Sequence, residues 1–102
     1  MQIVNVRFQV QPGKGDDFAA AFAPLAAATR DEPGNLWYVL SRNTENPDEY
    51  YALEGYTDEG LNAHFGSAHF QQGGAALAPF LAAGPEVIAR QVEGDGWSPL
   101  GL

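Results

Sequence analysis

The chain has 102 residues, with 5 lysines and arginines against 13 aspartates and glutamates, so its formal net charge is -8. Nucleic acid and anionic membrane surfaces are both bound through clustered cations, and this composition argues against either as a partner. There is no cysteine, which excludes disulfides, thiolate nucleophiles and Cys-bound metals, and no long apolar run or signal peptide, so we expect a cytoplasmic protein.

The N-terminal segment predicts a strand followed by a helix. Polar and apolar residues alternate over residues 2–11, which is the period of a half-buried strand. After a Pro-Gly turn, Asp16 and Asp17 suit a helix N-terminus, and apolar residues at helical spacing continue to about residue 30. Pro24 lies inside this helix, so we expect a kink there or a shorter helix.

Two strands follow, over residues 35–42 and 49–56, after the helix-stopping sequence Glu32-Pro33-Gly34. A polar segment of hairpin length joins them. The alternation of the second strand places Glu54 on the same face as its neighbours Ala52 and Tyr56. We assign that face to the helices.

The C-terminal part predicts two short helices and a fourth strand. Asp58 is expected to cap the first helix, and Ser67 the second, which continues as far as Gly84-Pro85. Gly73-Gly74 weakens the middle of the second helix by roughly 1 kcal/mol per glycine. Residues 86–92 form the last predicted strand, and residues 93–102 form a tail.

The predicted order is strand, helix, strand, strand, helix pair, strand, in a single domain of residues 1–102. Right-handed crossovers place every helix on one face of a four-stranded antiparallel sheet, which is the α+β, ferredoxin-like split β-α-β fold. We expect a homodimer, with the tail contacting the second copy, because the opposite face would carry a large apolar set. That set comprises Ile3, Trp37, Val39, Tyr51 and Leu53.

His64 and His69 are the two histidines of the chain and lie five residues apart. On one continuous helix this spacing would separate them by about 140°, so they are not the metal pair of a zincin, and we expect no metal. Each histidine either caps a helix end or lies at the core edge with its bonds satisfied. Alternatively, one of them lines a pocket as proton acceptor or hydrogen-bond donor.

Glu54 is the second candidate, because a carboxylate in the middle of a covered strand must be paired or become easier to protonate. It is either catalytic or bonded to a backbone amide, a tyrosine or His64. Tyr38 and Tyr56 either belong to the core or orient an aromatic substrate. Arg7 faces outward and is expected to pair across the dimer.

The sequence predicts no nicotinamide, flavin or nucleotide, and we expect no cofactor. Gly13-Lys14-Gly15 and Gly94-Asp95-Gly96 lack the remaining spacing of a dinucleotide or phosphate loop. No serine lies in a Gly-x-Ser-x-Gly elbow.

Four segments, taken in their order and spacing, carry a family resemblance. They are Glu32-Pro33-Gly34-Asn35-Leu36-Trp37-Tyr38, Asn46-Pro47-Asp48-Glu49-Tyr50, Glu54-Gly55-Tyr56-Thr57-Asp58-Glu59 and Ala63-His64-Phe65-Gly66-Ser67-Ala68-His69-Phe70. Together they resemble the antibiotic biosynthesis monooxygenase domain family, over nearly the whole chain. The resemblance implies the dimeric α+β barrel form of the ferredoxin-like fold. That family includes cofactor-independent monooxygenases of quinols or polyketide phenols, haem-degrading enzymes and an isomerase of a phosphorylated sugar.

Comparison by position narrows what the resemblance implies. The haem-degrading branch has an asparagine where this chain has Val6 and a tryptophan where it has Tyr56. The polyketide-oxidising branch has an asparagine where this chain has Ala52 and a tryptophan where it has Tyr56. The resemblance therefore implies neither haem nor the polyketide phenol as the particular substrate. The positions that match the family are those of Tyr38, Glu54, His64 and His69.

The resemblance therefore implies oxidation of a small quinol or phenolic aromatic by O2, without metal or flavin. His64 or His69 would accept a proton, with Glu54 as the third catalytic candidate, and the resulting anion would react with O2 directly. Substrate binding would fall to Tyr38, Tyr56, Val6, Phe8, Phe65 and Phe70. Two other functions stay open: a non-catalytic module that binds a small molecule, and an isomerase that uses the same pocket.

Overall fold

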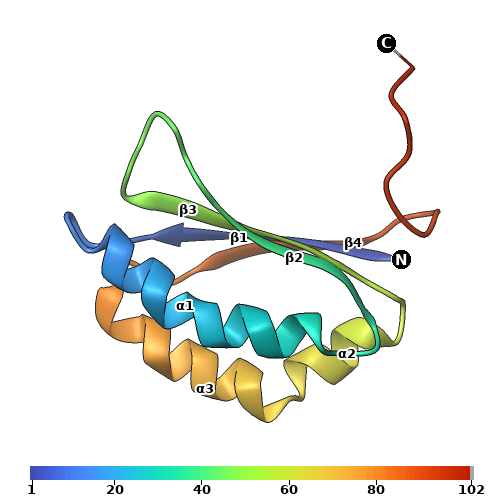
Figure 1. The fold of residues 1–102 in the computed structure, drawn as a ribbon, viewed down its shortest axis with the longest axis horizontal. Helices are drawn as coiled ribbons and strands as arrows, with labels where there is room; N and C mark the ends of the chain where they lie inside the picture. The colour runs from blue at the N-terminus through green and yellow to red at the C-terminus, as the bar shows by residue number, and fades with distance from the viewer. Residues whose placement is uncertain (102) are drawn as a thin grey trace.

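The computed structural model describes residues 1–101 and contains a four-stranded antiparallel sheet with its helices on one face (Figure 1). The elements are β1 (Gln2–Gln9), α1 (Gly15–Arg30), β2 (Asn35–Arg42), β3 (Glu49–Tyr56), α2 (Gly60–Phe65), α3 (Ala68–Leu77), a 3-10 helix (Ala78–Phe80) and β4 (Glu86–Gln91). The strand order is β2-β3-β1-β4. The predicted α+β, ferredoxin-like fold is confirmed, and the second copy stays a prediction. Within residues 1–101, no helix has the length and apolar character needed to cross a membrane.

The register of the sheet places a carboxylate at the centre of its helix-facing side. Glu54 on β3 lies opposite Val4 of β1 and Tyr38 of β2. All three side chains are buried, as are Ala52 and Tyr56 on the same face of β3. The face assignment made from the period of two is therefore correct for this strand.

Helix α1 covers the sheet through aromatic side chains. Phe22 stacks on Tyr38 with ring centroids 5.7 Å apart, and Phe18 packs against Tyr50 at 5.1 Å. The helix runs through Pro24 to Arg30, so of the two outcomes expected at Pro24, a kink or a shorter helix, the shortening does not occur. Pro24 lies on the exposed side of α1, where water can satisfy the carbonyl group that its missing amide leaves free.

The cap predicted for α2 is also wrong. The amide of Gly60, the first residue of α2, donates to the Thr57 hydroxyl at 3.1 Å. Asp58 makes no capping bond to α2 and instead lies 3.3 Å from the amino group of Met1. Thr57, which directly follows β3, therefore accepts the hydrogen bond at the start of α2 in place of Asp58.

The boundaries of α3 are set by a hydroxyl and a proline. Ser67 caps the helix as predicted and accepts a hydrogen bond from the Phe70 amide at 3.2 Å. The helix ends at Leu77, earlier than expected, and tightens into the 3-10 helix that contains Pro79. Proline has no amide hydrogen to continue the α-helical ladder, which accounts for the earlier end.

Gly73 and Gly74 adjoin in α3 but have different surroundings. A Cβ atom on Gly73 would lie 2.7 Å from Leu25 Cδ2, whereas one on Gly74 would meet nothing within 4 Å. Gly73 therefore permits the close approach of α3 to α1.

We expect Gly74→Ala to raise the free energy of unfolding by roughly 0.5–1 kcal/mol. Gly73→Ala should lower it by roughly 1–2 kcal/mol, because Leu25 must move. Urea unfolding measures both, and equal shifts of the same sign would contradict this distinction.

Side chains on the other face of the sheet are half-buried or exposed. Val39 is 45% exposed and Ile88 is 62% exposed. The C-terminal tail rises on this side, away from the helices (Figure 1), and its exposed Trp97 packs against Trp37 with centroids 5.1 Å apart. Arg7, which was expected to pair with a second copy, forms a 2.8 Å ion pair with Glu86 of its own β4. Leu102, the last residue of the predicted tail, lies outside the described residues.

Candidate active site

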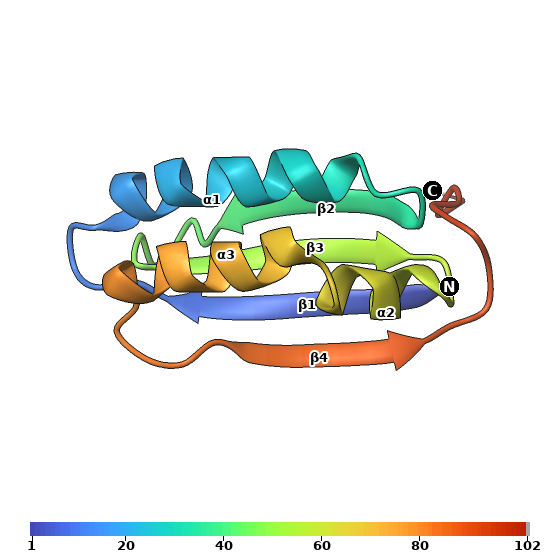
Figure 2. The same cartoon turned by 90° about the horizontal axis from the view of Figure 1, so that it is seen from below.

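A cavity of about 600 Å³ lies between the sheet and helix α3. Figure 2 shows α3 lying over β3 and β1, along the direction of the strands. The predicted wall residues Val6, Phe8, Phe65 and Phe70 all line it. Among the described residues, its lining includes four with polar side chains, which are Tyr38, Glu54, His64 and Gln71. An apolar cavity of this size with a few convergent polar groups is typical of a small-molecule site.

Both exposed and buried side chains line the cavity. Phe65, Phe70 and Val87 line it and are exposed to solvent. His64 and Glu54 also line it but are only 1% and 3% exposed. A ligand in the cavity therefore meets an imidazole and a carboxylate that are almost inaccessible to water.

Glu54 is held by the tyrosine two residues further along β3. The Tyr56 hydroxyl donates a 2.6 Å hydrogen bond to Glu54 Oε1. Burial raises the pKa of Glu54 to about 7, with a further rise from the charge of Glu32, although the bond from Tyr56 opposes the shift. Tyr56 is fully buried and is not among the lining residues, so it contacts Glu54 rather than the cavity.

The raised pKa of Glu54 predicts a pH-dependent stability. Between the ordinary pKa near 4.5 and the folded value of about 7, the folded state binds the proton more tightly than the unfolded state does. The contribution of Glu54 to the free energy of unfolding is therefore fully present below about pH 4.5, and it is lost as the pH rises through 7. Glu54→Gln keeps an oxygen for Tyr56 but cannot ionise. We expect the free energy of unfolding of the variant, relative to the parent, to increase by about 3 kcal/mol from pH 4.5 to pH 8.

Chemical unfolding of both proteins across this pH range, in metal-free buffer, measures the difference. The comparison cancels the titration of ionisable groups that are common to both chains and lie away from Glu54. A difference that stays constant with pH would show that Glu54 has an ordinary pKa.

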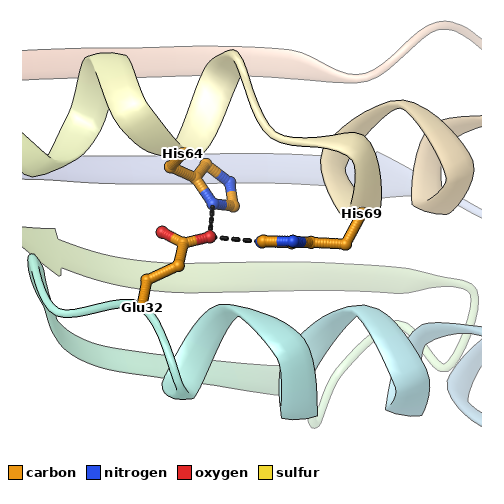
Figure 3. A group of neighbouring side chains, drawn as sticks. All are labelled: Glu32, His64 and His69. Carbon is orange, nitrogen blue, oxygen red and sulfur yellow. Dashed lines mark hydrogen bonds and ion pairs between the residues drawn. The ribbon is translucent and has the colours of Figure 1, made fainter.

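His64 is oriented by a carboxylate on its far side. Its Nδ1 atom lies 2.8 Å from Glu32 Oε2, and its Nε2 atom lies 3.9 Å from Glu54 Oε1 (Figure 3 shows the contact with Glu32). An ionised carboxylate can only accept, so we assign the proton to Nδ1, which leaves Nε2 as an acceptor. The ring centroids of Tyr56 and Phe70 lie 5.0 and 5.2 Å from that of His64, and this packing fixes the plane of the imidazole.

His69 converges on the same carboxylate but lies outside the cavity lining. Its Nε2 atom bonds to Glu32 Oε2, the oxygen that also bonds to His64 (Figure 3). The two histidines belong to different helices, because the chain turns at Gly66 and Ser67 between α2 and α3. Because of this turn, the two histidines are not held about 140° apart, as they would be on one continuous helix.

Glu32 is the site residue that the sequence analysis missed. It lies in the turn after α1, where Glu32-Pro33-Gly34 was interpreted as a helix stop. Figure 2 shows the end of α1 and helix α2 at the same end of the sheet, which brings this turn close to His64. The available signal was chemical: two neighbouring histidines need an acceptor, and Glu32 is a carboxylate at the helix end nearest to them.

The charges around the cavity disfavour a strongly anionic ligand. No lysine or arginine is among its described lining residues. Glu54 lies within the wall and Glu32 behind His64. A phosphate group would therefore meet carboxylates without a compensating cation, whereas a neutral aromatic molecule would not.

Comparisons with known proteins agree with the fold and with the four sequence segments. Residues 1–76 match the family model described as antibiotic biosynthesis monooxygenase. YcnE of Bacillus subtilis (strain 168), a candidate monooxygenase, is 27% identical over 94 residues, covering 91% of this chain and 92% of that protein.

Solved structures show the same relationship. A candidate antibiotic biosynthesis monooxygenase from Caulobacter crescentus CB15 shares 34% identity over 90% of each chain, with a TM-score of 0.82. A Deinococcus radiodurans structure covers 99% of this chain and 100% of its own with a TM-score of 0.85, and at 20% identity it shows likeness of fold alone. The family predicted from the sequence is thus confirmed: the chain belongs to the antibiotic biosynthesis monooxygenase family.

Proposed function

We propose that this protein is a monooxygenase that inserts an oxygen atom from O2 into a small quinol or phenolic aromatic, with no metal or flavin taking part. The observation that carries the proposal is the apolar cavity lined by a buried histidine, whose Nδ1 atom bonds to Glu32 and whose Nε2 atom is left as an acceptor. Family membership supports the oxygenase class. The dimensions and apolar wall of the cavity support an aromatic substrate.

The reaction begins with a proton transfer to His64. Nε2 accepts the phenolic proton, and the carboxylate of Glu32 stabilises the resulting imidazolium through its bond with Nδ1. Tyr38 lines the cavity, and its hydroxyl stays protonated because burial and the charge of Glu54 raise its pKa. It can therefore donate a hydrogen bond to an oxygen of the substrate.

The oxidation is completed by the substrate and O2. The electron-rich phenolate transfers an electron to O2, and the two radicals combine to form a carbon–oxygen bond at the ring. The oxygen–oxygen bond of this peroxide then breaks. One oxygen atom remains on the ring, and the other takes up protons and leaves as water. A quinol and O2 thus give a hydroxyquinone and water, and the quinol supplies all the electrons, so no external reductant is needed.

Oxygen uptake with a panel of quinols and phenols, in buffer containing a chelator, tests the proposal. We expect uptake above the rate of autoxidation for at least one substrate, with one atom of labelled O2 in the product. Absence of uptake with every member would overturn it. Ligand binding without uptake would then identify a binding module, and interconversion of substrate isomers without O2 would identify an isomerase.

We also propose that a second copy of the chain covers the outer face of the sheet. The exposed side chains of Val39 and Ile88 on that face support this assembly, as an apolar surface of this kind is usually buried against a partner. The isologous contact of two identical faces is the commonest arrangement in homodimers.

Sedimentation equilibrium tests the assembly. We expect a dimer for the parent chain and a shift toward monomer for Val39→Asp, because the new carboxylate would be buried without a partner. Thr44→Asp, which adds the same charge to the exposed turn between β2 and β3, should remain dimeric. A monomeric parent chain, or equal dissociation of both variants, would contradict the proposed interface.

A further inference from the structure

We propose that Glu32, His64 and His69 form a binding site for a divalent transition-metal ion of the zinc type. One ligand atom from each residue lies within 4.8 Å of the other two. Two imidazoles and one carboxylate are a donor set that suits zinc and its first-row neighbours. Figure 3 shows both rings directed at one end of the Glu32 carboxylate. This proposal is independent of the proposed oxidation.

The distances require only small side-chain movements to accept an ion. A tetrahedral zinc ion with bonds of about 2.1 Å holds neighbouring donor atoms about 3.4 Å apart. His64 Nδ1 and Glu32 Oε2 are now 2.8 Å apart, so they must separate by less than about 1 Å. The ligands come from the turn after α1 and from α2 and α3, so the backbone brings together residues that are 32 and 37 positions apart.

An unsatisfied atom points to a missing partner at this place. Glu32 Oε1 is buried and has no hydrogen-bond partner among the described residues. Leaving such an oxygen unpaired is costly, and structures usually provide a group, a water or an ion for it. A metal ion held by both carboxylate oxygens, or a metal-bound water that donates to Oε1, would satisfy it.

The surroundings of His64 match the environment of a metal-bound histidine. When one ring nitrogen binds a metal, the other usually donates its hydrogen to a carboxylate or carbonyl group. The free nitrogen of His64, Nε2, already faces the Glu54 carboxylate at 3.9 Å. On the opposite side the His69 side chain is 27% exposed, which gives an ion access from solvent. The three protein ligands leave a position for water.

An ion at this site would change the acid–base character of the cavity. With a metal on Nδ1, the neutral imidazole must carry its hydrogen on Nε2. Nε2 can then donate but not accept. Metal occupancy and proton acceptance by His64 therefore exclude each other, so Zn²⁺ should inhibit any reaction that uses His64 as a base.

The proposal is tested by titrating the untagged full chain with Co²⁺ and Zn²⁺. The chain has two histidines and no cysteine, so the ligand-field spectrum of imidazole-bound Co²⁺ can come from this pair alone. We expect one Co²⁺ per chain, displaced by Zn²⁺, with a metal-dependent rise in the midpoint of thermal unfolding. The imidazole NMR signals of both histidines should shift together.

His69→Ala should weaken Co²⁺ binding at least about a hundredfold, since loss of even an outer partner of a ligand costs 10-fold to 100-fold. The variant should fold, because His69 lies near the surface of α3 and alanine favours helix. Glu32→Gln, which removes the carboxylate ligand, should weaken Co²⁺ binding as His69→Ala does. Glu59→Gln removes the same charge from an exposed position beside α2, and it should bind as the parent does. No binding by the parent chain, or equal binding by the parent and His69→Ala, would overturn the proposal. The NMR shifts of the parent decide the matter even if a variant fails to fold.

Discussion

His64→Ala is expected to lower the rate of quinol oxidation by about 10²–10⁴-fold in metal-free buffer, the usual contribution of a positioned general base. The buried imidazole lines the cavity, and its accepting nitrogen lies 3.9 Å from Glu54, which also lines it. Alanine leaves no other imidazole among the described lining residues. The loss should fall on kcat more than on KM, because the shape of the apolar cavity, which binds the ring, changes little.

His69→Ala is the matched control for this result. His69 bonds to Glu32 but does not line the cavity. We therefore expect its removal to change the rate only a few-fold, while a direct base would give a loss comparable to that of His64→Ala. Steady-state oxygen uptake measures both variants. An unchanged rate in His64→Ala, with substrate affinity retained, would remove the proton acceptor from the mechanism.

Gly74→Leu is expected to abolish most substrate binding while leaving the fold more stable. Gly74 lines the cavity, and a side chain added there meets open space. Leucine would occupy part of the volume that the aromatic ring needs, and displacement of a substrate by about 1 Å can cost roughly 100-fold in rate. We therefore expect kcat/KM to fall by about 100-fold or more. The free energy of unfolding should rise, because leucine has a higher helix propensity than glycine.

Gly74→Ala is the control variant that distinguishes the effect of filling the cavity from the effect of a more stable helix. It supplies a similar gain in helix propensity but only one methyl group. We expect it to retain most activity, with a thermal midpoint above that of the parent. If Gly74→Leu binds and oxidises substrate as Gly74→Ala does, the cavity between α3 and the sheet is not the substrate site.

The local elements of this protein could be predicted from the sequence because their signals are short-range. The strands at Asn35–Arg42 and Glu49–Tyr56 have the predicted bounds. Alternation with a period of two placed Glu54 on the covered face without any knowledge of its neighbours. The cap predicted at Asp58 is wrong because the neighbouring Thr57 hydroxyl accepts the bond from the helix. Helix α1 is not shortened at Pro24, which lies on its exposed side.

The grouping of Glu32, His64 and His69 depended on tertiary structure. These residues are separated by up to 37 positions, and no local periodicity relates the end of α1 to the start of α3. Likewise, two adjacent glycines look equivalent in the sequence. Only the packing of α3 shows that Gly73 contacts Leu25 while Gly74 borders the cavity.

The sequence by itself determined the α+β class, the face on which Glu54 lies and the family resemblance, because these follow from local pattern and residue identity. The tertiary structure decided that the helices leave a cavity, that His64 rather than His69 reaches it, and that both histidines share one carboxylate. The physical reason is that cavities and convergent polar groups arise from the relative placement of distant segments. That placement is set by side-chain packing across the whole core, which a single stretch of sequence does not specify.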